Sequence, residues 1–441
     1  MSKITVIGAG SVGATIANDL MIQGIASEIV LIDVNKQKAF GEAMDIYQGA
    51  PFCSPTIVRS GDYDAASGSD IVIITSGLPR KAGQSRLELA QANVNIIKDI
   101  APQITAAAPD AIYIIVSNPV DVLTYVFHKI SGVPESHIIG SGTILDTSRL
   151  QSTLAKRFCI SPKNVHAHVY GEHGDSSFVP WSLVHIANNH IDSYKEHSPD
   201  CDRIKWDQNY EEIEQFVKTS GAQVIKNKGA TFYAVAMSVC HLCKCVQSTA
   251  GTAVTVSTMM HGEYGVSDVC LSTLVLVDNQ GVRGKILNQL TDGEVDKLRA
   301  SAEKLKEVMT SERGSFRFME PMKRHTTFRI GGPAAVFISP GSEEELREVL
   351  NLLKEENIPW TILGNGSNLL VSDEGFKGAV ISMSEGWAYS GVLREDEKAG
   401  KTLIRAGAGE LLSRTARLAM ECSLTGMEFA SGIPGTIGGA L

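Results

Sequence analysis

The sequence predicts an α/β fold, with a doubly wound parallel sheet followed by a second, α+β region. Strand and helix patterns alternate over the first 140 residues, as they do in repeated strand–helix–strand units. Helical patterns then dominate from residue 141 to about residue 310, with some antiparallel strand signals among them. The strands expected in the parallel sheet are Lys3–Ile7, Glu28–Ile32, Asp70–Thr75, Ala111–Val116 and His137–Gly140.

The first expected strand runs into a glycine pattern. Gly8, Gly10 and Gly13 form G-x-G-x-x-G between the apolar run Ile4–Ile7 and a segment with apolar residues at helical spacing. Such a turn lets a pyrophosphate approach the backbone at the N-terminus of the helix. The pattern predicts a dinucleotide site, and a strand-to-helix turn without a ligand is the alternative.

The second expected strand ends in an acid, Asp33, at roughly the distance from the glycines that dinucleotide sites show. A carboxylate at this place accepts hydrogen bonds from the adenosine ribose and repels a 2′-phosphate. We therefore expect NAD rather than NADP.

Length and composition limit the class of protein. A chain of 441 residues is too long for one ordinary core, so two or three domains are expected. A net charge of −9 argues against a general nucleic-acid surface. The sequence shows no signal-peptide pattern and no apolar run long enough to span a bilayer, and its 8 cysteines do not suggest a disulfide framework. We expect a cytoplasmic enzyme.

Two polar loops follow later strands of the expected sheet. The basic loop Gly77–Arg86 and the segment Ser117-Asn-Pro-Val-Asp121 lie at carboxyl ends of strands, where open α/β sheets bind ligands. An arginine that closes with the first loop polarises a carbonyl under attack. Asn118 is a candidate to bind the substrate oxygen or the nicotinamide ribose. A solvated basic loop is the alternative interpretation of Gly77–Arg86.

The strongest candidate for acid–base chemistry is His173, which lies in Gly171-Glu-His-Gly-Asp175 after an expected strand Val165–Tyr170. A histidine there can donate and accept a proton near neutral pH. Asp146 and Arg149 are three residues apart and fall on one face of a helix. Asp146 is placed to orient His173, and Arg149 to hold a substrate carboxylate. A surface histidine and a local ion pair are the alternatives.

The segment Cys240-His-Leu-Cys-Lys-Cys245 raises the question of a metal site. On a helix Cys240 and Cys243 share a face while Cys245 points away, whereas a closed tetrahedral site needs four converging ligands. We expect packed thiols and no metal.

A new pattern begins near Met319, after an expected linker at residues 311–318. The segment Val336–Ser339 reads as a strand, and Ser342-Glu-Glu-Glu345 as the start of a helix. The next strand, Trp360–Leu363, leads into a loop of small residues, Gly364–Asn368, whose amides are suited to phosphate. A plain turn is the alternative for this loop.

Together, these motifs of the first 310 residues resemble the NAD-dependent L-lactate dehydrogenases of the lactate/malate dehydrogenase family. The resemblance covers about residues 3–310 in family order. It implies a Rossmann NAD-binding domain at 1–141, an α+β catalytic domain at 142–310, a lactate/pyruvate substrate and a homotetramer. The segments that carry it are VIGAGSVG, EIVLID, SGLPRKAGQSR, VSNPVD, GSGTILDTSR, VYGEHGDSS and NKGATFYA.

The resemblance also implies a role for each matching residue. His173 is the proton donor and acceptor with Asp146 as its partner, and Arg86 polarises the carbonyl. The substrate-binding residues are Arg149, Asn118 and Thr231. The NAD-binding residues are Gly8, Gly10, Gly13, Asp33 and Asn118.

Two positions depart from the lactate pattern. Arg80 stands where lactate enzymes commonly have Gln and malate enzymes have an arginine that pairs with a second carboxylate. The alternative function is therefore a malate or broader 2-hydroxyacid dehydrogenase, although GSGTILDT and GEHGD favour lactate. Gln151 stands where many bacterial relatives have an arginine for fructose 1,6-bisphosphate, so His166 lacks that partner and such activation is not expected. A non-catalytic scaffold or a cell-wall-related fusion module is an alternative from another class.

Residues 319–441 resemble the N-terminal part of UDP-N-acetylenolpyruvoylglucosamine reductase through HTTFRIGGPA, LGNGSNLLVSD and FASGIPGTIGGA. The resemblance implies a truncated α+β FAD-binding domain of the p-cresol methylhydroxylase type. The family's catalytic residues match nothing in this segment, so no reductase activity is expected. Because the implied flavin domain is truncated and lacks its final strands, weak or no FAD retention is expected. The residues implied for FAD are Gly364, Asn365, Gly366, Ser367, Asn368, Gly432 and Gly435.

Overall fold

A computed structural model of the chain describes residues 2–78, 86–204, 206–310, 316–383, 387–396 and 401–440. The chain divides into two compact units, Met1–Glu307 and Val308–Leu441. Residues 311–315 of the expected linker lie outside the described residues, and 316–318 belong to a strand of the second unit. None of the described helices combines the length and the apolar character needed to cross a bilayer.

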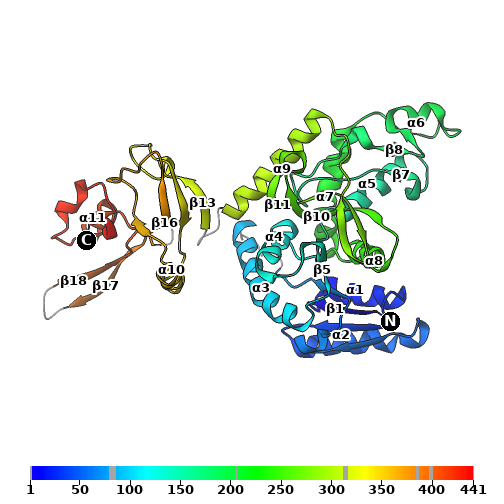
Figure 1. The fold of residues 1–441 in the computed structure, drawn as a ribbon, viewed down its shortest axis with the longest axis horizontal. Helices are drawn as coiled ribbons and strands as arrows, with labels where there is room; N and C mark the ends of the chain where they lie inside the picture. Colours follow the sequence, from blue (N-terminus) through cyan, green and yellow to red (C-terminus); the bar gives the residue numbers. More distant parts are fainter. Residues whose placement is uncertain are drawn as a thin grey trace. The chain divides into compact units, whose positions relative to one another are not determined.

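The first unit is built on a nine-stranded sheet with the order β12-β11-β10-β6-β5-β4-β1-β2-β3 (Figure 1). The strands from β3 to β6 are all parallel, which confirms the predicted doubly wound sheet. Its central strands are apolar and buried because helices cover both faces. The parallel strands are β1 Lys3–Ile7, β2 Glu28–Ile32, β3 Ile57–Ser60, β4 Ile71–Ile74, β5 Ile112–Ile115 and β6 Ile138–Gly140.

The crossover helices of this sheet pack their apolar sides against it. The helix α1 lies beside α8, and α3 lies beside α4 (Figure 1). Gly132, in the left-handed conformation with φ 68°, ends α4. The helices are α1 Ser11–Ile22, α2 Lys36–Gln48, α3 Arg86–Ala107 and α4 Val120–Ser131, and α8 is Tyr233–Gln247.

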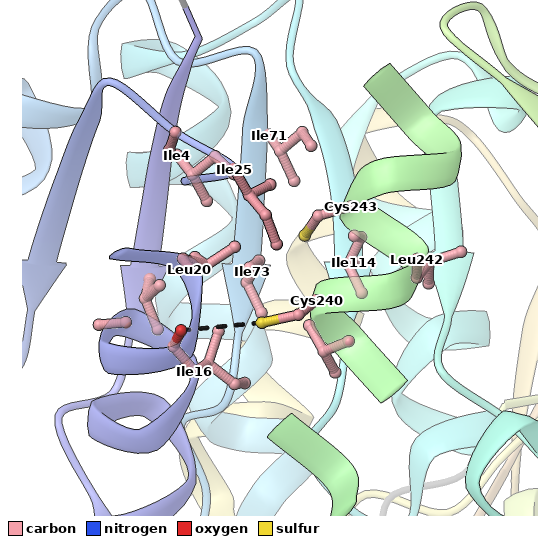
Figure 2. Packing of buried hydrophobic residues seen from close by; sticks show 14 of the residues in the cluster. Ile4, Ile16, Leu20, Ile25, Ile71, Ile73, Ile114, Cys240, Leu242 and Cys243 are labelled. Carbon is pink, nitrogen blue, oxygen red and sulfur yellow. Dashed lines mark hydrogen bonds between the residues drawn. The ribbon is translucent and has the colours of Figure 1, made fainter. Parts of the chain in front are cut away.

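The cysteines of α8 lie in the core between that helix, α1 and the sheet (Figure 2). Cys240 and Cys243 are fully buried, and the thiol of Cys240 approaches the carbonyl oxygen of Ile16 at 3.9 Å. Burial raises the pKa of the Cys240 thiol to about 12, so it stays protonated and packs as a small apolar group.

Three antiparallel strands extend the same sheet beyond β6. Ser257 at the middle of β10 pairs with Gly140 of β6, and a side chain at Gly140 would meet Ser257 and Thr124 at contact distances below 3 Å. A hairpin joins β11 to β12, with Asp278 opposite Gly281. These strands are β10 Thr252–His261, β11 Ser267–Asp278 and β12 Gly281–Lys285.

The remaining elements of the first unit surround these strands. The strand expected over Val165–Tyr170 is wrong in length, because only Val165–His166 (β7) pairs with β8, while Tyr170 bridges to Phe178 and Gly171 to Ser272. The helices are α5 Ile144–Arg157, α6 Ile191–His197, α7 Tyr210–Lys228 and α9 Asp292–Thr310, and β8 His185–Ile186 and β9 Asn189–His190 complete the small sheet. The 3-10 helices are η1 Ala50–Phe52, η2 Tyr63–Ala66, η3 Glu135–His137, η4 Pro162–Asn164, η5 Trp181–Leu183 and η6 Glu263–Gly265.

The second unit has a four-stranded sheet with the order β13-β14-β16-β15 and a separate hairpin, β17–β18. Ser342 caps α10 by accepting a hydrogen bond from the backbone N–H of Glu345 at 3.2 Å, so the predicted helix start is confirmed. The strands are β13 Phe316–Pro321, β14 Pro333–Ile338, β15 Trp360–Leu363, β16 Phe376–Ser382, β17 Ser390–Asp396 and β18 Lys401–Ala406. The helices are α10 Glu343–Glu355, α11 Leu412–Glu421 and α12 Ile437–Ala440, with 3-10 turns η7 Met322–Arg324 and η8 Glu428–Gly432.

Candidate active site

The glycine turn between β1 and α1 is held by close backbone packing. Gly8 has a φ of 103°, in the region that favours glycine. A side chain at Gly13 would meet the carbonyl oxygen of Gly8 at 1.8 Å, so α1 can approach the turn only with glycine there. At Gly10, in contrast, nothing lies within 4 Å of the position of a side chain. That space is where a phosphate group can approach the backbone.

Asp33 lies beside this turn. Its carboxylate accepts hydrogen bonds from the backbone N–H groups of Ala9, at 2.7 Å, and of Asn35, at 2.8 Å. Asp33, Gly8 and Gly10 line a cavity of about 980 Å³, which is large enough for a dinucleotide. The end of β2 thus places a negative charge at one wall of the cavity.

A second cavity, of about 460 Å³, lies at the carboxyl ends of the central strands. The two cavities share Thr75, Gly77 and Leu78 in their walls. The second cavity brings together five of the predicted site residues, namely Asn118, Asp146, Arg149, His173 and Thr231.

The carboxylate of Asp146 joins the histidine and the arginine. His173 Nδ1 lies 2.6 Å from Asp146 Oδ2, and Arg149 Nη1 donates to Asp146 Oδ1 at 2.8 Å. The three-residue spacing on α5 puts Asp146 and Arg149 on the same face of the helix. Because Asp146 occupies Nδ1, the other ring nitrogen, Nε2, is left for a ligand.

Charges in the site favour an ionised pair. The carboxylate of Asp146 raises the pKa of His173 to about 9, although burial and Arg149 act in the opposite direction. Burial alone would raise the pKa of Asp146, but the positive charges of His173 and Arg149 outweigh it and lower that pKa. At neutral pH the imidazole therefore carries a proton that it can give away.

Other backbone and side-chain contacts hold the remaining predicted residues. The carbonyl oxygen of Asn118 accepts a hydrogen bond from Asn93 Nδ2 at 2.7 Å, and Asn93 Oδ1 accepts one from the backbone N–H of Leu78 at 2.7 Å. The peptide bond between Asn118 and Pro119 is cis. Thr231 lies just before α8 and borders the cavity from that side. Asn93 thus ties together two of the polar segments that border the site.

Three further residues contact the site and have no assigned role in the sequence analysis. Asn93 is one, because a single buried asparagine in α3 carries no local signal. Gly221 of α7 is another: a side chain there would lie 3.2 Å from Arg149 Nη2, so the glycine leaves room for the guanidinium. Asp121 is the third, and it accepts a hydrogen bond from the backbone N–H of His173 at 2.8 Å. Asp121 follows Asn118 in one motif, but nothing in the motif indicates this distant partner.

Two predicted residues lie wholly or partly beyond what the structure describes. Arg80 is outside the described residues. Arg86 is the first residue of α3, and its side chain is likewise outside them. Gln151 is described, and its amide donates to the carbonyl oxygen of Ala167 at 3.2 Å.

In the second unit, the two predicted glycine loops adjoin each other. A side chain at Gly364 would meet Thr436 Oγ1 at 2.5 Å. Gly366 has a φ of 64°, and its carbonyl oxygen accepts a hydrogen bond from Thr327 at 3.0 Å, while that of Gly435 accepts one from Leu412 at 3.0 Å. Ser367, Asn368 and Gly432 lie in the same two loops.

A cavity of about 510 Å³ opens beside the first of these loops. Gly364 and Asn365 line it together with three basic residues, Arg324, His325 and Arg329. Backbone amides of a glycine loop and nearby guanidinium groups suit a ligand that carries phosphate. The residues present therefore fit the pyrophosphate of a flavin nucleotide.

Comparisons with known protein families divide the chain into three parts. Residues 2–140 match the NAD-binding domain of lactate/malate dehydrogenase, and residues 143–314 match the alpha/beta C-terminal domain of the same family. Residues 334–441 match an FAD-binding domain.

Individual relatives match the same region. An L-lactate dehydrogenase of Clostridium botulinum (strain Hall) is 46% identical over 311 residues, which are 70% of this chain and 96% of that protein. L-lactate dehydrogenase 1 of Clostridium acetobutylicum is 46% identical over 310 residues, or 70% of this chain and 98% of that protein. The crystal structure of a minor L-lactate dehydrogenase from Enterococcus mundtii is similar with a TM-score of 0.66, at 35% identity over 70% of this chain and 97% of that one. A lactate dehydrogenase from a Medee basin deep-sea metagenome library gives a TM-score of 0.67 at 34% identity, covering 70% of this chain and 98% of that one.

Proposed function

This chain belongs to the lactate/malate dehydrogenase family, and from that membership we propose that its first unit is an NAD-dependent L-lactate dehydrogenase. It transfers a hydride reversibly between the cofactor and a 2-hydroxy acid, with lactate and pyruvate as the pair of substrates. The observation that carries the proposal is the pair of His173 and Asp146, whose atoms Nδ1 and Oδ2 lie 2.6 Å apart in a cavity that shares part of its wall with the dinucleotide cavity.

Each residue of the cavity has a part in the proposed reduction of pyruvate. NADH would be held in the cavity lined by Gly8, Gly10 and Asp33, and when bound it would supply the hydride. His173 gives its proton from Nε2 to the carbonyl oxygen, so that the product is a neutral hydroxyl group. Asp146 stays ionised and orients the imidazole through Nδ1. In the oxidation of lactate the same atoms act in reverse.

The arginines bind and polarise the substrate. The guanidinium of Arg149 has five N–H donors, so it can hold Asp146 and a substrate carboxylate at the same time. Asn118 and Thr231, which border the cavity, complete the substrate contacts, and Asn118 also contacts the nicotinamide ribose. The family resemblance assigns the polarisation of the carbonyl to Arg86.

A steady-state assay with NADH tests the proposed substrate. We expect pyruvate to be reduced with a higher kcat/KM than oxaloacetate. Preference for oxaloacetate would favour the second candidate, a malate or broader 2-hydroxyacid dehydrogenase, to which the sequence points through Arg80. Absence of activity with both acids would contradict the family-based proposal and leave a binding role.

Arg80 should control the use of a second carboxylate. We expect Arg80→Gln to lower kcat/KM for oxaloacetate about tenfold more than for pyruvate, because only the dicarboxylate loses an ionic partner. The measurement is the ratio of the two kcat/KM values. Lys81→Gln removes the same charge from the neighbouring position and serves as the control. If kcat/KM falls equally for the two substrates, Arg80 is a loop charge without a selective role.

Asp33 should determine the choice between NADH and NADPH. Replacing it with serine removes the charge that repels a 2′-phosphate, so we expect the ratio of kcat/KM for NADPH to that for NADH to rise about tenfold. Asp45→Ser, on the exposed side of α2, changes the net charge equally and should leave the ratio as it is. Equal use of the two cofactors by the unaltered chain would refute this role of Asp33.

We propose a homotetramer in the cytoplasm, as the family resemblance implies. Exposed apolar side chains on α2 and η1 support association, among them Phe40, Met44 and Phe52, which are 59%, 48% and 91% exposed. Light scattering on the purified chain tests the assembly.

For the second unit we propose FAD as the ligand class. Gly364–Asn368 and the loop with Gly432 and Gly435 would hold its pyrophosphate, and FAD when bound supplies redox chemistry. The reductase family's catalytic residues match nothing in residues 319–441, so no reduction of the peptidoglycan precursor is proposed. The flavin absorbance of the purified chain, before and after addition of FAD, tests this assignment.

A further inference from the structure

Asp121 is a buried carboxylate that contacts the loop of His173 from outside the substrate cavity. It lies in the first turn of α4, is 3% exposed and is not among the residues that line the cavity. Its Oδ2 accepts a hydrogen bond from the backbone N–H of His173 at 2.8 Å, and its Oδ1 accepts one from Ser257 Oγ at 2.6 Å. Both carboxylate oxygens therefore have partners from distant parts of the chain.

Ser257 belongs to a pair of serines that reach both sides of the site. It stands directly opposite Ser272 on the neighbouring strands β10 and β11, and both are fully buried. Ser272 Oγ accepts a hydrogen bond from the backbone N–H of Thr143 at 3.1 Å, at the start of the helix that carries Asp146. The backbone of Ser272 also exchanges hydrogen bonds with Gly171, at 3.0 and 3.2 Å. The two strands thus hold the histidine loop and the start of α5 in one frame.

We propose that Asp121 is a positioning residue for the reaction: its carboxylate fixes the backbone of His173 against Ser257 and so aligns the imidazole with Asp146. The inference rests on the proposed role of His173 as the proton donor. Its physical basis is that an ionised carboxylate is costly to bury unless strong donors surround it. At Asp121 those donors are the backbone N–H of His173 and the hydroxyl group of Ser257 on β10.

The charge of Asp121 adds an electrostatic contribution to this alignment. The charged and titratable groups that face it are His173, Glu172 and Cys270. Burial raises the pKa of Asp121 to about 6, and its hydrogen bonds to Ser257 and His173 act against that rise. The ionised carboxylate in turn helps to keep the proton on His173. Hydrogen bonding and charge can be separated by substitution.

The experiment compares two variants of Asp121 with one control in the full chain. Asp121→Asn keeps an oxygen for the His173 N–H and offers its amide to Ser257, but it removes the charge. Asp121→Ala removes both the contacts and the charge. Asp278→Asn is the control, because Asp278 is also a buried carboxylate of this sheet, 2% exposed and paired with Arg283, away from the cavity.

For Asp121→Ala we expect kcat for pyruvate reduction to fall about tenfold to a hundredfold, the loss that a small misplacement causes. KM for pyruvate should change little, because Arg149 is held separately by Asp146 on α5. For Asp121→Asn we expect a much smaller loss than for Asp121→Ala, with kcat close to that of the unaltered chain. The pKa of the His173 imidazole, measured by NMR titration without substrate, should fall in this variant but not in Asp278→Asn.

Several results would overturn the proposal. One is a folded Asp121→Ala variant with unchanged kcat, and another is an equal loss of kcat in the Asp278→Asn control. A loss in Asp121→Ala with a parallel rise in KM, or no recovery in Asp121→Asn, also contradicts positioning through hydrogen bonds. If the unaltered chain reduces no 2-oxo acid, the proposed function fails. The titration of His173 in Asp121→Asn still tests the electrostatic contribution of Asp121 in that case, and an unchanged pKa of His173 contradicts that contribution.

Discussion

Replacing His173 with alanine should lower kcat for pyruvate reduction by about 10²- to 10⁴-fold, the range that a general acid contributes. The carbonyl oxygen gains negative charge when the hydride arrives, and without the imidazole it has no proton donor. His173 holds that proton firmly at neutral pH, because Asp146 raises its pKa to about 9. The measurement is the steady-state rate with NADH at saturating pyruvate.

The control for this substitution is His197→Ala. His197 is an exposed histidine of α6, and its Nδ1 lies 2.8 Å from the carbonyl oxygen of Ser193. It should keep the activity of the unaltered chain. Binding of NADH should survive in both variants, since the dinucleotide cavity does not include either histidine. A folded His173→Ala variant that reduces pyruvate at the rate of the unaltered chain would contradict the assignment of His173 as the proton donor.

Replacing Asp146 with asparagine should move the pH dependence of the reaction to lower pH. Pyruvate reduction needs the protonated imidazole, which is present below its pKa and is lost as the pH rises through it. Asp146 is the largest cause of the rise from 6.5 to about 9, so its removal lets the pKa fall toward the ordinary value. At pH 8 the protonated fraction, and with it kcat/KM, should then fall by about 30-fold.

The direction of the effect reverses for lactate oxidation, which needs the neutral imidazole. In that direction kcat/KM rises as the pH passes the pKa, so the rising limb should also move to lower pH in Asp146→Asn. The profiles of kcat/KM in both directions, which report the free enzyme, are the measurement. If the limbs of these pH profiles lie at the same pH in Asp146→Asn as in the unaltered chain, the pairing of Asp146 with His173 is contradicted.

The central strands of the first unit could be predicted because helices cover both of their faces. Strands such as Ile71–Ile74 and Ile112–Ile115 are buried throughout and read as continuous apolar runs. The edge strand Ile57–Ser60 is absent from the prediction, because only Val58 of its four residues is fully buried and the apolar pattern is lost. Burial on both faces, rather than strand propensity, is what the sequence reveals.

The strand predicted over Val165–Tyr170 is too long for a related reason. The apolar residues there are buried, but after His166 the backbone pairs with Phe178 and Ser272 instead of continuing beside β8. The residue pattern of this segment indicates neither of these partners. Likewise, the short apolar run in Phe376–Ser382 does not by itself indicate that β16 pairs with both β14 and β15.

In the candidate site, too, some residues could be proposed from the sequence and others could not. His173, Asp146 and Arg149 could be proposed because their residue types and spacing indicate chemistry on their own. The contribution of Asp121 could not be proposed from the sequence, because it depends on contacts with His173 and Ser257. These two residues lie 52 and 136 positions away from Asp121 along the chain. The size and sign of the pKa shift at His173 likewise follow from burial and from neighbouring charges, which only the folded chain defines.

The contact between Gly140 and Ser257 joins the two halves of the first unit within one sheet. Since Gly140 is packed between Thr124 and Ser257, the parallel and antiparallel strands meet at a point that admits no side chain. For protein engineering this means that the nucleotide-binding half is not an exchangeable module. A chimera that replaces residues 2–140 with the same segment of another protein must keep a glycine at the end of β6. It must also keep a residue at position 124 of α4 that leaves the same space. Otherwise β10 cannot pair with β6.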